Sequence, residues 1–187
     1  MASLGANVLV SDINEKAGHE TVQMIDNANP PTDDNDQRLC AAVFVKCDVA
    51  NPHHFRKLCI ACIRQFGSVD IIMLNAGITE PKPYGFFDSK PEQWKKVIDI
   101  NLVSVIECTQ IAVNEFLRDK DSVIVITASI AGTVPQPETP VYAATKAGVV
   151  NFVRSVSWMH QQTHVRINAV CPHFTLTPLV CTMLTRF

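Results

Sequence analysis

Residues 122–152 read SVIVITASIAGTVPQPETPVYAATKAGVVNF, and the two ends of this stretch have different characters. Residues 122–128 form a short apolar run rich in β-branched side chains, which is typical of a strand buried on both faces. The second end starts with Pro140 and predicts a helix to about Met159, because proline is favoured in the first turn of a helix. A buried strand followed by a helix is the repeating unit of parallel α/β folds.

The same alternation runs along the rest of the chain. A capping box from Ser89 to Glu92 is expected to start one helix, and residues 27–38 (NANPPTDDNDQR) predict a solvated loop. Because the strands are nearly continuous apolar runs, we predict a doubly wound parallel sheet in a three-layer α/β/α domain that spans residues 1–187. The predicted strands are 7–12, 41–47, 69–74, 122–128 and 165–171, and the predicted helices are 15–26, 52–66, 89–117 and 140–159.

Composition and charge argue against several classes of protein. The 187 residues fit one domain, and an apolar fraction of 47% supports a sizeable core. The net charge is −2 and lysines and arginines form no run, so a nucleic-acid-binding surface is not expected. No apolar run approaches the roughly 20 residues of a membrane span, and no signal peptide is recognisable. The seven cysteines are scattered, which favours reduced thiols and a cytoplasmic protein.

The helix predicted from Pro140 carries the most reactive group of side chains. Tyr142 and Lys146 are four residues apart and therefore share a helix face, and Ser129 follows the strand before them. Parallel α/β folds place their active sites just beyond the carboxyl ends of the strands. A phenol has a reference pKa of about 10, and a nearby ammonium favours its ionised form. Tyr142, Lys146 and Ser129 could therefore carry out proton transfer, although Tyr-x-x-x-Lys alone also occurs by chance in many helices.

Further motifs lie at or beyond the predicted strand ends. They are LNAGIT at 74–79, INLVSV at 100–105, INAVCP at 167–172, CDV at 47–49, and an aspartate at the end of the first strand. In this order and spacing the chain resembles the short-chain dehydrogenase/reductase family over essentially its whole length. The sequence of these motifs is most similar to that of the subgroup of NAD-dependent 15-hydroxyprostaglandin dehydrogenases. The resemblance implies a Rossmann-like fold, NAD as cofactor, and interconversion of a secondary alcohol and a ketone by hydride transfer.

The resemblance also implies a role for each matching catalytic residue. Tyr142 would be the general acid/base, and Lys146 would lower the tyrosine pKa and bind the nicotinamide ribose. Ser129 would orient the substrate oxygen, and Asn101 would hold a water that relays the proton to solvent. The substrate would be a small alcohol or ketone, and the subgroup resemblance suggests a lipid-like one. Pairing through the helices that carry Asn101 and Tyr142 would give a homodimer or homotetramer. No metal is implied.

The cofactor contacts implied by the resemblance lie at the strand ends. Asp12 would bind both hydroxyls of the adenosine ribose and repel a 2′-phosphate, which favours NAD over NADP. His173 departs from the family pattern, which has glycine after the proline; it would either narrow the nicotinamide site or be a tolerated loop variant. The other positions implied to contact NAD are Asp48, Val49, Asn75, Ala76, Gly77 and Thr177, besides Tyr142 and Lys146.

A second departure concerns the two ends of the family pattern. The family begins with a strand and a T-G-x-x-x-G-x-G loop, whereas MASLGA at residues 1–6 resembles the end of the following helix. The family also adds a substrate-covering segment after the position of residue 180. We therefore expect a domain truncated at both ends, with a break in the sheet between the strands 7–12 and 69–74. Without the glycine-rich loop, we expect weak or no NAD binding and no measurable activity in these 187 residues.

Two other interpretations remain open beside the enzyme. One is a catalytically inactive truncated product, or an incomplete gene model, that pairs with full-length subunits. The other is a redox or metal site at Cys59 and Cys62, although a single CxxC inside an amphipathic helix is more typical of a buried helix face. An apolar stripe in the helix 89–117 is expected to form core or subunit interface; it comprises Ile100, Val103, Ile111 and Phe116.

Overall fold

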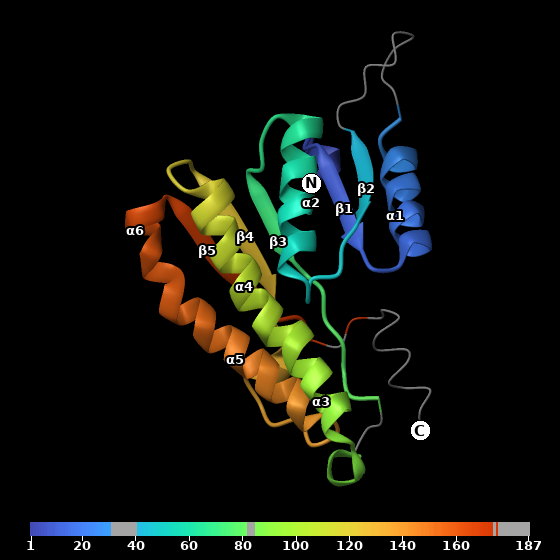
Figure 1. Cartoon of the computed structure of the whole chain (residues 1–187), viewed down its shortest axis with the longest axis vertical. Coiled ribbons are helices and arrows are strands. Elements are labelled where there is room, and N and C mark those ends of the chain that lie inside the picture. The colour runs from blue at the N-terminus through green and yellow to red at the C-terminus, as the bar shows by residue number, and fades with distance from the viewer. Residues whose placement is uncertain (31–40, 82–84, 174, 176–187) are drawn as a thin grey trace. The chain divides into compact units, whose positions relative to one another are not determined.

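The computed structural model describes residues 1–30, 41–81, 85–173 and 175, and it divides into two compact units. The first unit is Met1–Val69 and the second is Asp70–Phe187. Each unit contains its own parallel sheet, and the elements of both are labelled in Figure 1.

The first unit is a two-stranded parallel sheet with two helices. Strand β1 (Val8–Asp12) pairs with β2 (Ala42–Lys46) from Val8↔Ala42 to Asp12↔Lys46. Helix α1 (Glu15–Ala28) is capped by Asn14, and helix α2 (Pro52–Phe66) by Asn51, whose side chains accept hydrogen bonds from first-turn amides. Gly67 ends α2 with a φ of 88°, a left-handed conformation that glycine adopts without strain.

Helix α1 lies very close to β2. A Cβ atom at Gly18 would be 2.0 Å from the ring of Phe44, so only glycine allows this approach. His19, the next residue of α1, contacts the same ring, with 4.8 Å between the two ring centroids. Gly18 and His19 of α1 thus both pack on the ring of Phe44 in β2.

The second unit is a three-stranded parallel sheet in the order β3-β4-β5. Strands β3 (Ile71–Leu74) and β5 (Val165–Val170) flank β4 (Ser122–Thr127). A short 3-10 turn, η2 (Phe86–Asp88), precedes a continuous helical run with two π-helical segments. That run comprises α3 (Pro91–Ile98), η3 (Asp99–Val103), α4 (Ser104–Ile111) and η4 (Ala112–Leu117). The elements between β4 and β5 are η5 (Ile130–Gly132), α5 (Pro140–Val156), η6 (Ser157–Met159) and α6 (His160–Thr163).

The core of the second unit lies between the sheet and the helices α4 and α5, which cover the same face of it (Figure 1). Ile124 and Ile126 of β4 are fully buried, as is Val149 of α5. On the opposite face, Ile71 and Met73 of β3 are exposed. Apolar burial of this kind supplies the main stabilising free energy of a domain, at about 25 cal/mol per Å².

The predicted parallel α/β class is confirmed, and the element boundaries agree within two residues, except that α5 ends at Val156 and the 3-10 turn η6 occupies the last three residues of the predicted helix 140–159. The described strands form two separate ladders, β1-β2 and β3-β4-β5, and the expected break between the strands 7–12 and 69–74 stays a prediction. The predicted capping box is wrong by one residue. Because Pro91 occupies the first helical position, Lys90 becomes the N-cap, and its backbone N–H donates to Gln93 Oε1 at 3.0 Å. The Ser89 hydroxyl instead donates to the Phe86 carbonyl.

The helical run Pro91–Leu117 is long and apolar enough to cross a membrane by length and composition alone. However, half of its most apolar window is buried inside the structure. Val105, Cys108 and Leu117 of this run belong to the core. The run therefore has the surroundings of a core helix, and its apolar character is explained by the packing of the second unit.

Candidate active site

Helix α5 places Tyr142 and Lys146 one turn apart. The Lys146 Nζ lies 5.6 Å from the centroid of the Tyr142 ring, within the range of a cation–π contact. Lys146 is only 3% exposed, and its Nζ donates a 2.6 Å hydrogen bond to the carbonyl of Thr127, the last residue of β4. Burial lowers the pKa of Lys146 from 10.5 to about 8, since a low-dielectric environment disfavours the ammonium. The structure therefore holds a buried amine beside a tyrosine.

Asn101 lies in the π-helical segment η3 and is fully buried. Its side chain forms a pair of 2.8 Å hydrogen bonds with the backbone of Ile78: Oδ1 accepts from the N–H and Nδ2 donates to the carbonyl. Nδ2 also donates to Thr145 Oγ1 at 3.2 Å. The side chain of Asn101 thus connects the segment after β3 to helix α5, a structural role that sequence reasoning did not identify.

Ser129 follows β4 and is the N-cap of η5, where its hydroxyl accepts a 3.2 Å hydrogen bond from Ala131 N–H. The short turn η5 packs directly on α5, because a Cβ at Gly132 would be 2.6 Å from the carbonyl oxygen of Lys146. The turn is also tied to the end of β5, since Ile130 N–H donates to the Pro172 carbonyl at 3.0 Å. Ser129 is therefore held against the helix that carries Tyr142 and Lys146.

The segment after β3 passes the same group of side chains. Asn75 Oδ1 accepts a 2.9 Å hydrogen bond from the Thr127 hydroxyl. A Cβ at Gly77 would lie 3.4 Å from Asn101 Oδ1 and 3.5 Å from Lys146 Nζ, so the backbone of Gly77 approaches both. Ala76 lies between them in the sequence and is exposed. Asn75, Ala76 and Gly77 are thus brought next to the catalytic candidates of the second unit.

Sequence reasoning missed one charged residue of this group. Glu80 is 5% exposed, and its carboxylate accepts hydrogen bonds from the backbone N–H groups of Val141 at 2.6 Å and Tyr142 at 3.1 Å. These contacts span about sixty residues of sequence, and no local spacing predicts them. Only its position soon after the LNAGIT motif could have drawn attention to it.

The residues expected to bind adenosine lie in the first unit. Asp12 is the last residue of β1, and its Oδ1 accepts a 2.8 Å hydrogen bond from Asn14 N–H. Asp48 and Val49 follow β2, and Asp48 Oδ1 accepts from Ala50 N–H at 3.0 Å. The two strand ends are adjacent, because Cys47 N–H donates to the Asp12 carbonyl. Thr177 lies outside the described residues.

Taken separately, the donors and acceptors of each unit match the ribose hydroxyls of a nicotinamide dinucleotide. An ammonium has three hydrogens, and the Thr127 carbonyl accepts one from Lys146, so the amine can also donate to ribose hydroxyls. The backbone of Gly77 lies beside that amine, and because glycine has no side chain, a ribose can approach it closely. In the first unit, the carboxylate of Asp12 has a second oxygen that can accept hydrogen bonds from a ribose.

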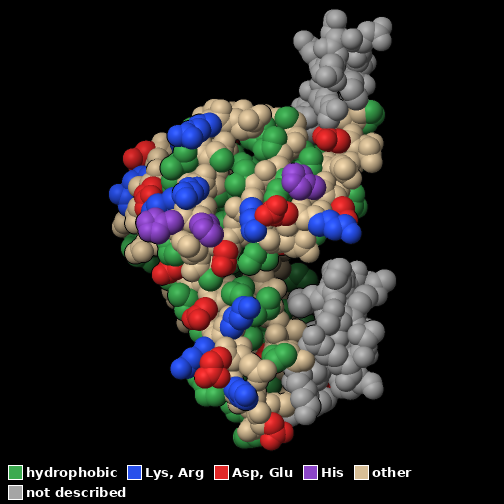
Figure 2. All heavy atoms as spheres, turned by 45° about the vertical axis from the view of Figure 1, so that its right-hand side comes forward, with side chains coloured by type: hydrophobic (Ala, Val, Ile, Leu, Met, Phe, Trp, Pro, Cys, Tyr) green, Lys and Arg blue, Asp and Glu red, His purple; other side chains and the backbone are tan. Residues whose placement is uncertain are grey.

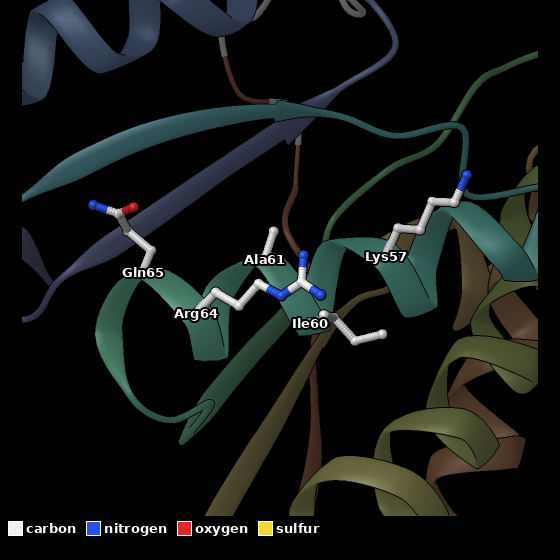
Figure 3. Close-up of a pocket in the computed structure, with 5 residues that line it drawn as sticks. All are labelled: Lys57, Ile60, Ala61, Arg64 and Gln65. Carbon is white, nitrogen blue, oxygen red and sulfur yellow. The ribbon is translucent and has the colours of Figure 1, made fainter.

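Features elsewhere on the described surface do not join this group. A shallow hollow on helix α2 is lined by Lys57, Ile60, Ala61, Arg64 and Gln65, and it includes none of the predicted site residues (Figure 3). Cys59 is buried in the same helix, and the Cys62 thiol donates to the Ser68 carbonyl, as expected for helix packing. On the described part of the face shown in Figure 2, basic and acidic side chains are interspersed.

Comparisons with known proteins show what the chain is similar to. A family model described as short chain dehydrogenase matches residues 1–185. The chain is 31% identical to bovine (Bos taurus) 15-hydroxyprostaglandin dehydrogenase (NAD+) over 181 residues, which cover 94% of this chain and 61% of that enzyme. It is 33% identical over 180 residues to cis-4-hydroxycyclohexanecarboxylate dehydrogenase from Sinomonas cyclohexanicum, covering 96% of this chain and 68% of the relative.

Among solved structures, a short chain dehydrogenase/reductase from Burkholderia phymatum in complex with NAD superposes with a TM-score of 0.84 and 25% identity. The match covers 100% of this chain and 63% of that structure. The chain thus spans about three fifths of the length of the bovine relative.

Proposed function

Because the chain belongs to the short-chain dehydrogenase family, we propose that it contributes the catalytic face of an NAD-dependent oxidoreductase. The reaction would interconvert a secondary alcohol and a ketone. The observation that carries this proposal is the buried ammonium of Lys146, 5.6 Å from the ring of Tyr142 at the start of α5. Bound NAD would accept the hydride from the alcohol.

In this proposal Tyr142 is the catalytic acid/base. Its phenolate removes the hydroxyl proton of the alcohol, and its phenol returns a proton in the reverse direction. The Lys146 ammonium stabilises the phenolate electrostatically and binds the nicotinamide ribose. The hydroxyl of Ser129 orients the substrate oxygen. The proton then passes to solvent through a water at Asn101, while the Asn101 side chain keeps Ile78 and Thr145 in place.

Cofactor choice is proposed to depend on the first unit. A carboxylate at Asp12 would accept hydrogen bonds from both adenosine ribose hydroxyls and would repel the 2′-phosphate of NADP. Asp48 and Val49 would flank the adenine, and Asn75, Ala76, Gly77 and Thr177 would contact the nicotinamide half.

For the substrate we propose a lipid-like secondary alcohol, supported by the similarity to the bovine 15-hydroxyprostaglandin dehydrogenase. A cytoplasmic location is supported by the described cysteines, which are all thiols.

Replacement of Tyr142 by phenylalanine tests the reaction. Turnover is measured in a chimera in which the flanking segments of the bovine relative extend this chain, with 15-hydroxyprostaglandin and simpler secondary alcohols as substrates. Tyr142→Phe should reduce turnover by about 10²–10⁴-fold, the usual contribution of a proton-transfer group. Fluorescence titration with NADH and NADPH should show unchanged cofactor binding and a preference for NADH. A variant within threefold of the parent would remove Tyr142 from its proposed role.

We also propose that the protein is a homo-oligomer, paired through the helices that carry Asn101 and Tyr142. Val103 and Ile106 of the first helix are exposed apolar side chains, and Ala144 and Ala147 of α5 are exposed and small, which permits close packing of a second copy. Ile106→Asp should convert the oligomer to a monomer in light scattering at micromolar concentration. The matched control is Val134→Asp on a loop, which should leave the assembly intact. A monomeric parent protein would contradict this proposal.

A further inference from the structure

We propose that Glu80 is a positioning residue for Tyr142: its buried carboxylate replaces the missing N-terminal cap of α5 and fixes the first turn of that helix. The inference concerns a residue that neither the family motifs nor the comparisons assign. This inference rests on the proposed function only where it takes Tyr142 as the catalytic group. The hydrogen bonds between Glu80 and α5 are present whether or not the protein is active.

The first turn of α5 lacks the cap that helices usually provide for themselves. Thr139 is the N-cap residue, but its side chain makes no capping hydrogen bond. Its hydroxyl oxygen is buried and has no hydrogen-bond partner among the described residues. Pro140 occupies the first helical position and has no N–H to satisfy. The next two amides, those of Val141 and Tyr142, are the remaining donors that need a partner at this buried end.

The Glu80 carboxylate provides one oxygen for each of these two amides. Oε1 accepts from Val141 N–H at 2.6 Å, and Oε2 accepts from Tyr142 N–H at 3.1 Å. Hydrogen bonds to a carboxylate are about twice as strong as those between neutral groups. A negative charge at this end also interacts favourably with the helix dipole. The two carboxylate oxygens of Glu80 therefore match the two amide donors, and one of these donors is the backbone N–H of Tyr142.

The contact acts on Tyr142 more than on Lys146. Lys146 lies one turn further along α5 and has its own anchor in the Thr127 carbonyl. Thr145 is likewise held by Asn101. Glu80 itself is held in place, because Asn101 binds both backbone groups of Ile78, two residues earlier. Loss of the Glu80 carboxylate should therefore loosen the turn that carries the phenol while the amine stays in position.

The first experiment needs no activity and uses the 187-residue chain. Glu80→Gln keeps the size of the side chain but removes the charge and one acceptor oxygen. We expect amide hydrogen exchange at Val141 and Tyr142 to become about 10- to 100-fold faster, the loss expected for a charge-assisted hydrogen bond. The chain has only two tyrosines, Tyr84 and Tyr142, so ring-labelled tyrosine gives two NMR signals that Tyr84→Phe assigns. The Tyr142 signal should shift or broaden in Glu80→Gln.

The matched control is Glu92→Gln, the same change at an exposed first-turn carboxylate of α3. It should leave both Tyr142 readouts unchanged. In the chimera with the bovine segments, Glu80→Gln should lower kcat about 10- to 100-fold, as a misplaced catalytic group does, while the affinity for NADH changes less than twofold. Glu80→Asp, which keeps the charge, should recover part of kcat.

The outcomes separate the two proposals. Unchanged exchange and an unchanged Tyr142 signal in Glu80→Gln, or equal effects in Glu92→Gln, would overturn the role of Glu80. So would equal losses of kcat and NADH affinity, because they would indicate general disruption of the site. An inactive chimera with the exchange and NMR effects present would leave Glu80 as the cap of α5 and would contradict the proposed function instead.

Discussion

At the scale of single residues, the main electrostatic cost in the described site is the burial of Lys146. Its surroundings hold the pKa near 8, whereas the same lysine in the unfolded chain has its ordinary value of 10.5. Below pH 8 both states are protonated, and the folded protein carries the full cost of a buried ammonium. Between pH 8 and 10.5 the folded state loses its proton while the unfolded state keeps it, so this cost disappears as the pH rises.

The prediction is a pH-dependent effect of Lys146→Met. At pH 7 the variant should gain about 3 kcal/mol in unfolding free energy from removing the buried charge, offset by loss of the bond to Thr127. This gain should vanish by pH 10.5. Urea unfolding of variant and parent at several pH values measures the difference. Lys96→Met, at an exposed position of α3, should show no such trend. A pH-independent difference for Lys146→Met would show that the amine keeps its ordinary pKa.

At the scale of elements, local sequence predicted most of what the structure contains. Strands and helices are set by apolar runs, prolines and capping asparagines, all of which are local signals. The contacts that assemble the site are not local: Glu80 binds the start of α5, and Asn101 binds Ile78. These depend on how elements pack, and a polar residue after a strand gives no sign of which distant amide it meets. The error at Ser89 was local and arose because Pro91 fixes the helix start.

The contact between α1 and β2 gives an element-scale prediction. Gly18→Ala places a methyl group where the Phe44 ring lies, so it should destabilise the first unit by roughly 1–3 kcal/mol, as overpacking does. With Phe44→Leu in the background, the same change should be neutral or slightly stabilising, because alanine is the better helix former. A double-mutant cycle by far-UV circular dichroism in urea measures the coupling. Additive effects would mean that the helix can move away from the ring.

At the scale of the whole molecule, each sheet is hydrogen-bonded within its own unit among the described residues. Residues 1–187 are proposed as one domain by sequence, but two separate ladders predict incomplete cooperativity. Both tryptophans, Trp94 and Trp158, belong to the second unit, so their fluorescence reports on that unit alone. Circular dichroism reports on the helices of both.

We therefore expect the two probes to give different unfolding curves in urea, which is the usual sign of a departure from two-state behaviour. Gly18→Ala should shift the curve measured by circular dichroism and leave the tryptophan curve in place. Coincident curves for the parent, or equal shifts of both curves in the variant, would show that the chain unfolds as a single cooperative unit.

The π-helical segments of the helix from Pro91 to Leu117 have a consequence for its rotational phase. Each segment accommodates about one extra residue, which turns the following helix by about 100° relative to an uninterrupted α-helix. Val103 is the last residue of η3 and Ile111 the last of α4, so they differ in phase by about 80°, and Val103 is 40% exposed whereas Ile111 is 5% exposed. A stripe drawn on a regular helical wheel is therefore divided between the core and the surface. The turn that carries Asn101 inward also sets the phase of the helix that follows it, and with it the side chains that remain outside for the proposed second copy.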